Sequence, residues 1–154
     1  MNPESGPPDR LPEPPSVVIH SLADARLVLD AAGALPVMLL SAPEAACFMG
    51  AGWWRALIHA ATAGRPDALI DVLDCGDAAG WAMQALRLGQ RRLIVDPACP
   101  QFDAVLERAV TTGATIATIR PPALDLAQHG AGRKLHGWLA GTSGAGRDKT
   151  GPVG

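Results

Sequence analysis

The residues best suited to chemistry stand directly after short apolar runs that are typical of buried β-strands. Two such residues follow the first run and one follows each later run. Their side chains carry imidazole, hydroxyl, carboxylate and guanidinium groups. They are His20, Ser21, Ser41, Asp74, Asp96 and Arg120. In an open parallel sheet ligands bind at the carboxyl ends of the strands. The sequence therefore predicts a site at that edge.

These residue types indicate a site for a small anionic ligand. Arg120 suits a phosphate or carboxylate because its guanidinium can donate two parallel hydrogen bonds. Ser21 and Ser41 are further candidate ligand-binding residues. The candidate catalytic residues are His20, Asp74 and Asp96, and a proton transfer by His20 or Asp74 would be general acid–base catalysis.

The same three catalytic candidates, His20, Asp74 and Asp96, have side chains that can bind a divalent metal. The structural alternative is that each carboxylate caps a turn or pairs with Arg120. We predict no metal site and no cofactor, and no complete catalytic constellation identifies an enzyme.

Four other polar or thiol residues have both structural and chemical interpretations. Asp77 is predicted to cap a helix N-terminus. Asp71 lies within a strand, so either that half of the strand is exposed or the carboxylate has a buried partner. Cys75 and Cys99 lie near predicted helix starts, which can lower a thiol pKa, whereas buried structural cysteine is the ordinary alternative.

Strands and helices alternate along the chain. Strands are predicted at 17–20, 37–40, 68–74, 93–95 and 115–119, each followed by a segment with helical periodicity. This alternation predicts a single three-layer αβα domain on a five-stranded parallel sheet, flavodoxin-like or more broadly Rossmann-like, with 2-1-3-4-5 as the expected strand order. The alternative is a (βα) half-barrel that pairs with a second copy.

The predicted helices have recognisable limits. Residues 44–63 are expected to be helical with a break near Gly50, because glycine is unfavourable within a helix. Residues 77–88 form the next helix, which Gly89 closes. The last predicted element is a helix, broken by Gly130 and Gly132, that contains Leu124, Leu126, Leu135, Trp138 and Leu139.

The five-unit pattern resembles that of response-regulator receiver domains. Asp74 at the end of the third strand stands where their phospho-acceptor does, and Arg120-Pro121 resembles their Lys-Pro pair. His20-Ser21 replaces their acidic pair, and Asp96 stands where they have Ser or Thr. The resemblance therefore implies shared architecture and gives no support for Mg²⁺-dependent phosphorylation.

Composition narrows the class of protein. The chain has 154 residues and a formal charge of −2, which gives no reason to expect a nucleic-acid partner. Residues 1–15 include six prolines and are expected to form a disordered arm, 16–140 the domain, and 141–154 a disordered Gly-rich tail. Three widely separated cysteines favour a reducing cytoplasm, and no apolar run is long enough for a membrane span.

Two functional hypotheses follow. The first is a binding or interaction protein that acts either as a homodimer or as an adaptor to another protein. The homodimer would form through Trp53 and Trp54, since adjacent helical residues point about 100° apart and one indole is expected to be exposed. The second is a small enzyme or binder of an anionic metabolite at the carboxyl ends of the strands.

Overall fold

The computed structural model describes residues 14–63 and 69–141, and the predicted terminal arm and tail lie almost wholly outside these ranges. The described residues contain six strands. They are β1 (Ser16–Val18), β2 (Val37–Leu40), β3 (Leu69–Asp74), β4 (Arg92–Ile94), β5 (Thr115–Ala117) and β6 (Ala123–Asp125). All pairings between neighbouring strands are parallel. The α/β class and the flavodoxin-like parallel sheet are thus confirmed, with six strands in place of five.

Six helices accompany these strands in the described ranges. They are α1 (Leu22–Ala32), α2 (Ala45–Met49), α3 (Ala51–Thr62), α4 (Ala79–Arg87), α5 (Phe102–Thr112) and α6 (Ala131–Leu139). The expected break at Gly50 is confirmed, because this residue ends α2 and precedes α3 with a φ of 80°. A positive φ is easily adopted only by glycine.

The strand order is β5-β4-β3-β2-β1-β6, so the expected order 2-1-3-4-5 is wrong. From β1 to β5 each strand lies beside its predecessor, which is the order that the half-barrel alternative implies. Right-handed crossovers that always advance in one direction place their helices on the same face of a sheet. Accordingly, the buried residues of all six helices join one core cluster with alternate strand residues such as Val17, Leu39 and Leu73.

The other face of the sheet has its own smaller core. It contains Val18, Met38, Leu40, Val72, Ile94 and Ala117, and within the described ranges no helix supplies a residue to its buried members. Side chains alternate between the two faces of a strand, which explains the division between the clusters. Strands buried on both faces read as near-continuous apolar runs, as they do here.

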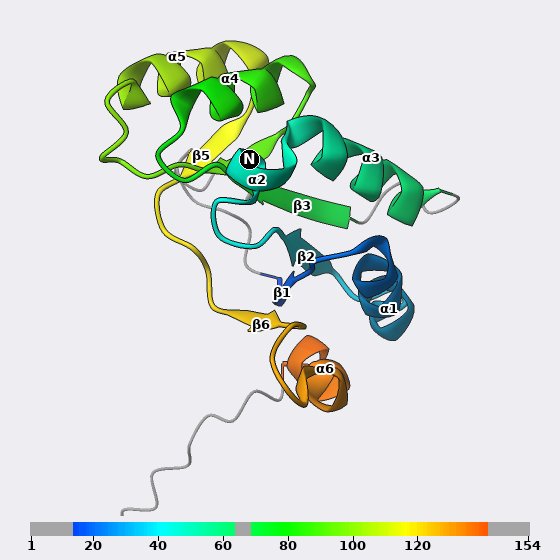
Figure 1. The fold of residues 1–154 in the computed structure, drawn as a ribbon. Helices are drawn as coiled ribbons and strands as arrows, with labels where there is room; N and C mark the ends of the chain where they lie inside the picture. Colours follow the sequence, from blue (N-terminus) through cyan, green and yellow to red (C-terminus); the bar gives the residue numbers. More distant parts are fainter. Residues whose placement is uncertain (1–13, 64–68, 142–154) are drawn as a thin grey trace, which may run out of the picture.

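The connection from β5 to β6 is short and crosses the sheet. Residues 118–122 join the two strands, and Figure 1 shows this yellow segment running from β5 at one edge to β6 at the other. A flat sheet would separate these edges by roughly 24 Å, whereas the connecting chain spans about 21 Å at most when extended. The sheet must therefore curve, and the connection passes close to the strands between its ends.

The C-terminal part of the chain differs from the sequence prediction. Residues 123–125 form β6, which pairs with β1, and the helix begins only at Ala131. The indole Nε1 of Trp138 donates a 2.8 Å hydrogen bond to the carbonyl oxygen of Ser16, which ties α6 to β1. A three-residue strand is too short to show a period, so this strand could not be predicted from the pattern of apolar residues.

Candidate functional site

Three of the residues predicted from sequence meet where β2 and β3 end. Arg120, in the crossing connection, donates from Nη1 to Oδ2 of Asp74 at 2.5 Å and from Nη2 to the carbonyl oxygen of Ser41 at 2.9 Å. The hydroxyl of Ser41 accepts a 2.9 Å hydrogen bond from the backbone amide of Asp74. The other oxygen of Asp74 accepts from the amide of Gly76 at 2.8 Å. The carboxylate of Asp74 is therefore buried, and both of its oxygen atoms accept hydrogen bonds.

His20 forms a second pair at the end of β1. Its Nε2 lies 2.7 Å from Oδ1 of Asp125, which ends the neighbouring strand β6, and both side chains are about one-third exposed. Burial alone would raise the pKa of Asp125. The hydrogen bond from His20, the amide of Ala127 and the positive charges of His20 and Arg120 outweigh burial and lower that pKa below its usual value.

The two pairs lie close enough to influence one another. Arg120 contributes to the lowered pKa of Asp125 as well as binding Asp74. Residues at or just after the ends of β1, β2, β3 and β6, with one residue of the crossing connection, thus form one polar rim, which we define as His20, Ser41, Asp74, Arg120 and Asp125. Its geometry would allow proton exchange at His20 and anion contact at the exposed part of Arg120.

Two other predicted site residues are used locally. The hydroxyl of Ser21 caps α1 by accepting from the amide of Asp24 at 3.1 Å, and that carboxylate accepts from the amide of His20 at 2.8 Å. The exposed Asp96 accepts a 2.8 Å hydrogen bond from the amide of Ala98, which closes a turn after β4. Within the described part of the chain, Asp96 makes no side-chain contact with the polar rim that involves a hydrogen bond or an ion pair.

Of the two alternatives for Asp71, an exposed strand segment or a buried partner, the structure shows buried partners. Its Oδ2 accepts from the indole of Trp54 and from the side-chain amide of Gln90, each at 2.9 Å. Arg55 lies 3.8 Å away. Trp54 and Gln90 are buried, so this is a satisfied network of the core. The structural interpretation of Asp71 agrees with these contacts.

Cys47 and Cys75 do not have the properties of nucleophiles. Burial, followed by the charge of Asp74 and the nearby Cys47, raises the pKa of Cys75 to about 12, so this residue fits the interpretation as a buried structural cysteine and not that of a thiol with a lowered pKa. Burial and the charges of Glu44, Asp77 and Asp74 raise the pKa of Cys47 as well. A thiol is reactive as a thiolate, which these environments disfavour.

The predicted cap at Asp77 is also wrong. Helix α4 begins at Ala79 with Ala78 as its N-cap, and no side chain caps this helix. Asp77 is instead exposed in the turn between β3 and α4.

The turn between β3 and α4 contains Gly76, whose φ is 55° and whose Cα faces the side chain of Glu44: a Cβ there would lie 2.8 Å from Glu44 Cγ. Glu44 itself has a positive φ of 56°, which is uncommon for a residue with a side chain.

The adjacent tryptophans differ in burial. Trp54 is fully buried, so it offers no surface to a partner, whereas Trp53 is partly buried; their ring centroids are 6.2 Å apart. Three large apolar side chains on other helices are exposed, two on α2 and one on α4. We define Phe48, Met49 and Trp81 as the α2–α4 patch. Sequence reasoning missed this patch because periodicity alone does not show that α2 ends after five residues.

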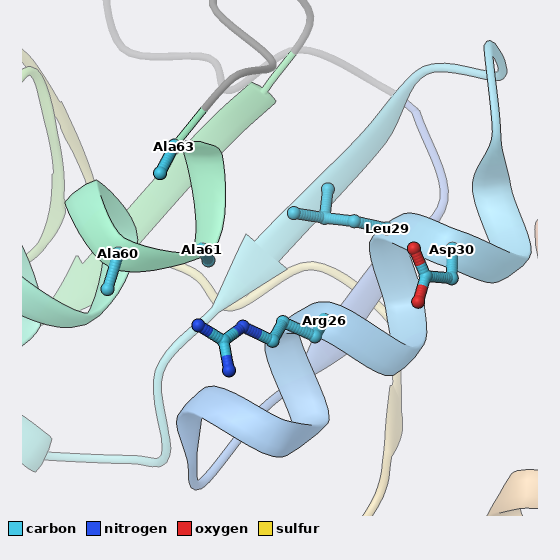
Figure 2. Close-up of a pocket in the computed structure, with 6 residues that line it drawn as sticks. All are labelled: Arg26, Leu29, Asp30, Ala60, Ala61 and Ala63. Atoms are coloured by element: carbon cyan, nitrogen blue, oxygen red, sulfur yellow. The ribbon is translucent and has the colours of Figure 1, made fainter.

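A separate hollow of about 250 Å³ lies between α1 and α3. Figure 2 shows Arg26 extending from α1 towards α3, whose contribution to the wall consists of alanines. The lining residues are Arg26, Leu29, Asp30, Ala60, Ala61 and Ala63. No residue predicted to belong to the site lines this hollow.

Searches for other features gave negative results over residues 14–63 and 69–141. No group of three or more histidine, cysteine, aspartate or glutamate side chains in these ranges could hold a metal ion. No helix in the same ranges has the length and apolar character needed to cross a membrane. No protein-family model matches the chain, and no curated protein is significantly similar to it.

Proposed function

We propose that this protein is an interaction domain that binds another polypeptide through the α2–α4 patch. The observation that carries the proposal is the exposure of Phe48 (78%), Met49 (51%) and Trp81 (39%) on two adjoining elements. Exposed aromatic and methionine side chains that lie together are typical of protein interfaces.

The internal contacts within the polar rim support a binding function over a catalytic one. Arg120 already contacts one carboxylate and one carbonyl oxygen, and His20 already contacts Asp125. These internal partners neutralise the groups that would otherwise meet a substrate. The three cysteines are free thiols, which suits action in a reducing cytoplasm.

The position of the tryptophans changes which residues the interface would use. The homodimer predicted through Trp53 and Trp54 would have only Trp53 available, because Trp54 is buried and bonded to Asp71. The α2–α4 patch offers more apolar surface. A partner, whether another protein or a second copy, is therefore proposed to contact the patch.

Capture of partners from an extract, with three baits, tests this proposal. The baits are the wild-type protein, the double variant Phe48→Ser/Met49→Ser and the control Val110→Ser, whose residue is 81% exposed on α5. We expect a protein retained by the wild type and the control to be lost from the double variant, and to bind again when purified. Identical retention by all three baits would contradict an interface at the patch.

A second candidate function is binding of a small anionic metabolite at the polar rim. The observation in its favour is that His20, Asp125 and Arg120 are partly exposed and lie close together. An anion that displaced Asp74 from Arg120 would gain a guanidinium contact, and His20 would be placed to move a proton. Thermal-shift measurements with phosphorylated metabolites, with and without Mg²⁺, test this function, and no stabilisation by any of them counts against it.

A further inference from the structure

The residues of the α2–α4 patch lie on two elements that are in contact. Trp81, in the first turn of α4, lies over the end of α2: its Cζ3 atom is 3.7 Å from where a Cβ of Gly50 would lie. Phe48 and Met49 are the last two residues of that helix. Figure 1 shows α2 beside the start of α4. Apolar anchors from both elements are thus available to one ligand.

Negative charge borders this surface on the side of the β3–α4 turn. Glu44 precedes α2 and lies against Gly76, and Asp77 is the next residue of the turn; both carboxylates are on exposed residues. In the described ranges neither one forms an ion pair. The raised pKa of Cys47 reflects burial and also the charges of Glu44, Asp77 and Asp74. Three carboxylates therefore act on one residue of α2.

Over residues 14–63 and 69–141, no positive side chain forms an ion pair with Glu44 or Asp77, whereas Asp74 is paired with Arg120. The nearest basic residues on α3 and α4 are Arg55, which contacts Gln90 and Asp71, and Arg87, which lies in the last turn of α4. A partner that brought its own positive charges would gain Coulomb attraction with Glu44 and Asp77. A partner with negative charges there would be repelled.

Building on the proposed function, we infer that the patch binds a basic amphipathic helix, with apolar side chains on Phe48, Met49 and Trp81 and lysine or arginine beside Glu44 and Asp77. The patch is formed by helices, and no strand edge is available there for a partner strand, since β3 lies inside the sheet. Binding of a helix by its apolar face is the recognition mode that such a surface permits. Ionic contacts at an exposed border weaken with salt, so the affinity should fall as ionic strength rises.

Three synthetic peptides of about 18 residues, long enough to form a helix, test the inference. The basic peptide has leucine on one helical face and lysine on the other. The acidic peptide replaces each lysine with glutamate, and the scrambled peptide keeps the basic composition without an apolar face. We expect the full-length protein to bind the basic peptide at least tenfold more tightly than either other peptide, as measured by fluorescence anisotropy.

Protein variants separate the apolar from the ionic contribution. Glu44→Gln/Asp77→Asn is expected to weaken binding of the basic peptide about three- to tenfold and to reduce its salt dependence. The charge-matched control is Asp103→Asn/Glu107→Gln, which removes two exposed carboxylates on α5. This control should change neither the affinity for the basic peptide nor the salt dependence of that affinity. Phe48→Ser should weaken binding at least tenfold, and Val110→Ser should leave it unchanged. Unfolding in urea shows whether each variant is folded.

The outcomes distinguish this inference from the proposed function. Equal binding of the acidic and basic peptides, no binding of any peptide, or no effect of Glu44→Gln/Asp77→Asn would overturn the basic helix as the partner. A loss of partner capture with Phe48→Ser/Met49→Ser would still support an interaction domain in those cases. If sedimentation shows self-association that Phe48→Ser abolishes, the occupant is a second copy and the inference of a separate partner is wrong.

Discussion

Arg120 donates a 2.5 Å hydrogen bond to the carboxylate of Asp74, a residue 46 positions earlier in the chain. The same guanidinium binds the carbonyl oxygen of Ser41. These contacts hold the connection between β5 and β6 against the carboxyl ends of β2 and β3. Arg120, whose guanidinium is the group best suited to bind an anion, is thus used to hold the connection between β5 and β6 in place.

Replacing Arg120 with alanine should lower the free energy of unfolding by about 2–4 kcal/mol, because the buried carboxylate of Asp74 loses its charged partner. Arg108→Ala is the matched control, since Arg108 is exposed on α5, and its effect should stay within about 0.5 kcal/mol. Urea unfolding measures both. Equal stability of the two variants would show that the ion pair contributes little.

The Asp71 network should be important for the core. Asp71→Ala leaves the indole N–H of Trp54 and one donor of Gln90 without their acceptor. Each buried donor left unpaired costs roughly 1–3 kcal/mol, so we expect a loss of at least about 2 kcal/mol in urea unfolding. Glu107→Ala, at an exposed carboxylate of α5, is the comparison, and a similar loss there would contradict this assignment.

Glycine is required at position 76 and not at position 52. Gly76→Ala places a Cβ 2.8 Å from Glu44 Cγ at a φ of 55°, and we expect destabilisation by about 1–3 kcal/mol. Gly52 lies in α3 with no atom within 4 Å of the added carbon, so Gly52→Ala should stabilise by roughly 0.5–1 kcal/mol. Thermal unfolding of both variants tests the contrast, which fails if the two changes have the same sign.

Asp125 should make stability depend on pH in the acid range. Its pKa in the folded protein lies below the ordinary value of 3.8, so the unfolded state binds more protons. This contribution to stability is present above pH 3.8 and is lost as the pH falls through the folded pKa. Asp125→Asn should flatten the decrease in the urea midpoint between about pH 5 and pH 3. Asp103→Asn should keep the wild-type slope, and unchanged slopes in both variants would show that Asp125 is not linked to folding.

The thiols should react slowly in the native protein. With a pKa of about 12, only about one Cys75 side chain in ten thousand is a thiolate at pH 8. Cys75 and Cys99 are also buried. Ellman's reagent should therefore detect both of them only after unfolding in guanidinium, and the partly exposed Cys47 should account for any slow native reaction. Rapid labelling of Cys75 without denaturant would contradict this environment.

The sequence by itself determined the local elements and the type of sheet. Apolar runs that alternate with helical periodicity predict βαβ units, and such units build a parallel sheet because a crossover helix returns the chain to the same end. This reasoning located His20, Ser41 and Asp74 at strand ends, and it predicted for Asp71 either an exposed strand segment or a buried partner. It also located the break at Gly50, since the cost of glycine within a helix is a local property.

Only the tertiary structure decided which strands are neighbours and which side chains meet. The order of β1 to β5, the pairing of the short β6 with β1 and the contact of Arg120 with Asp74 depend on closing loops and packing faces far apart in the chain. Burial is decided at the same level: Trp54 is enclosed while Phe48 is exposed, although both belong to apolar helical segments. The raised pKa of Cys75 follows from that enclosure and not from its position before a helix. Local patterns encode the conformation of a segment, whereas the environment of a side chain is set by all the segments that pack around it.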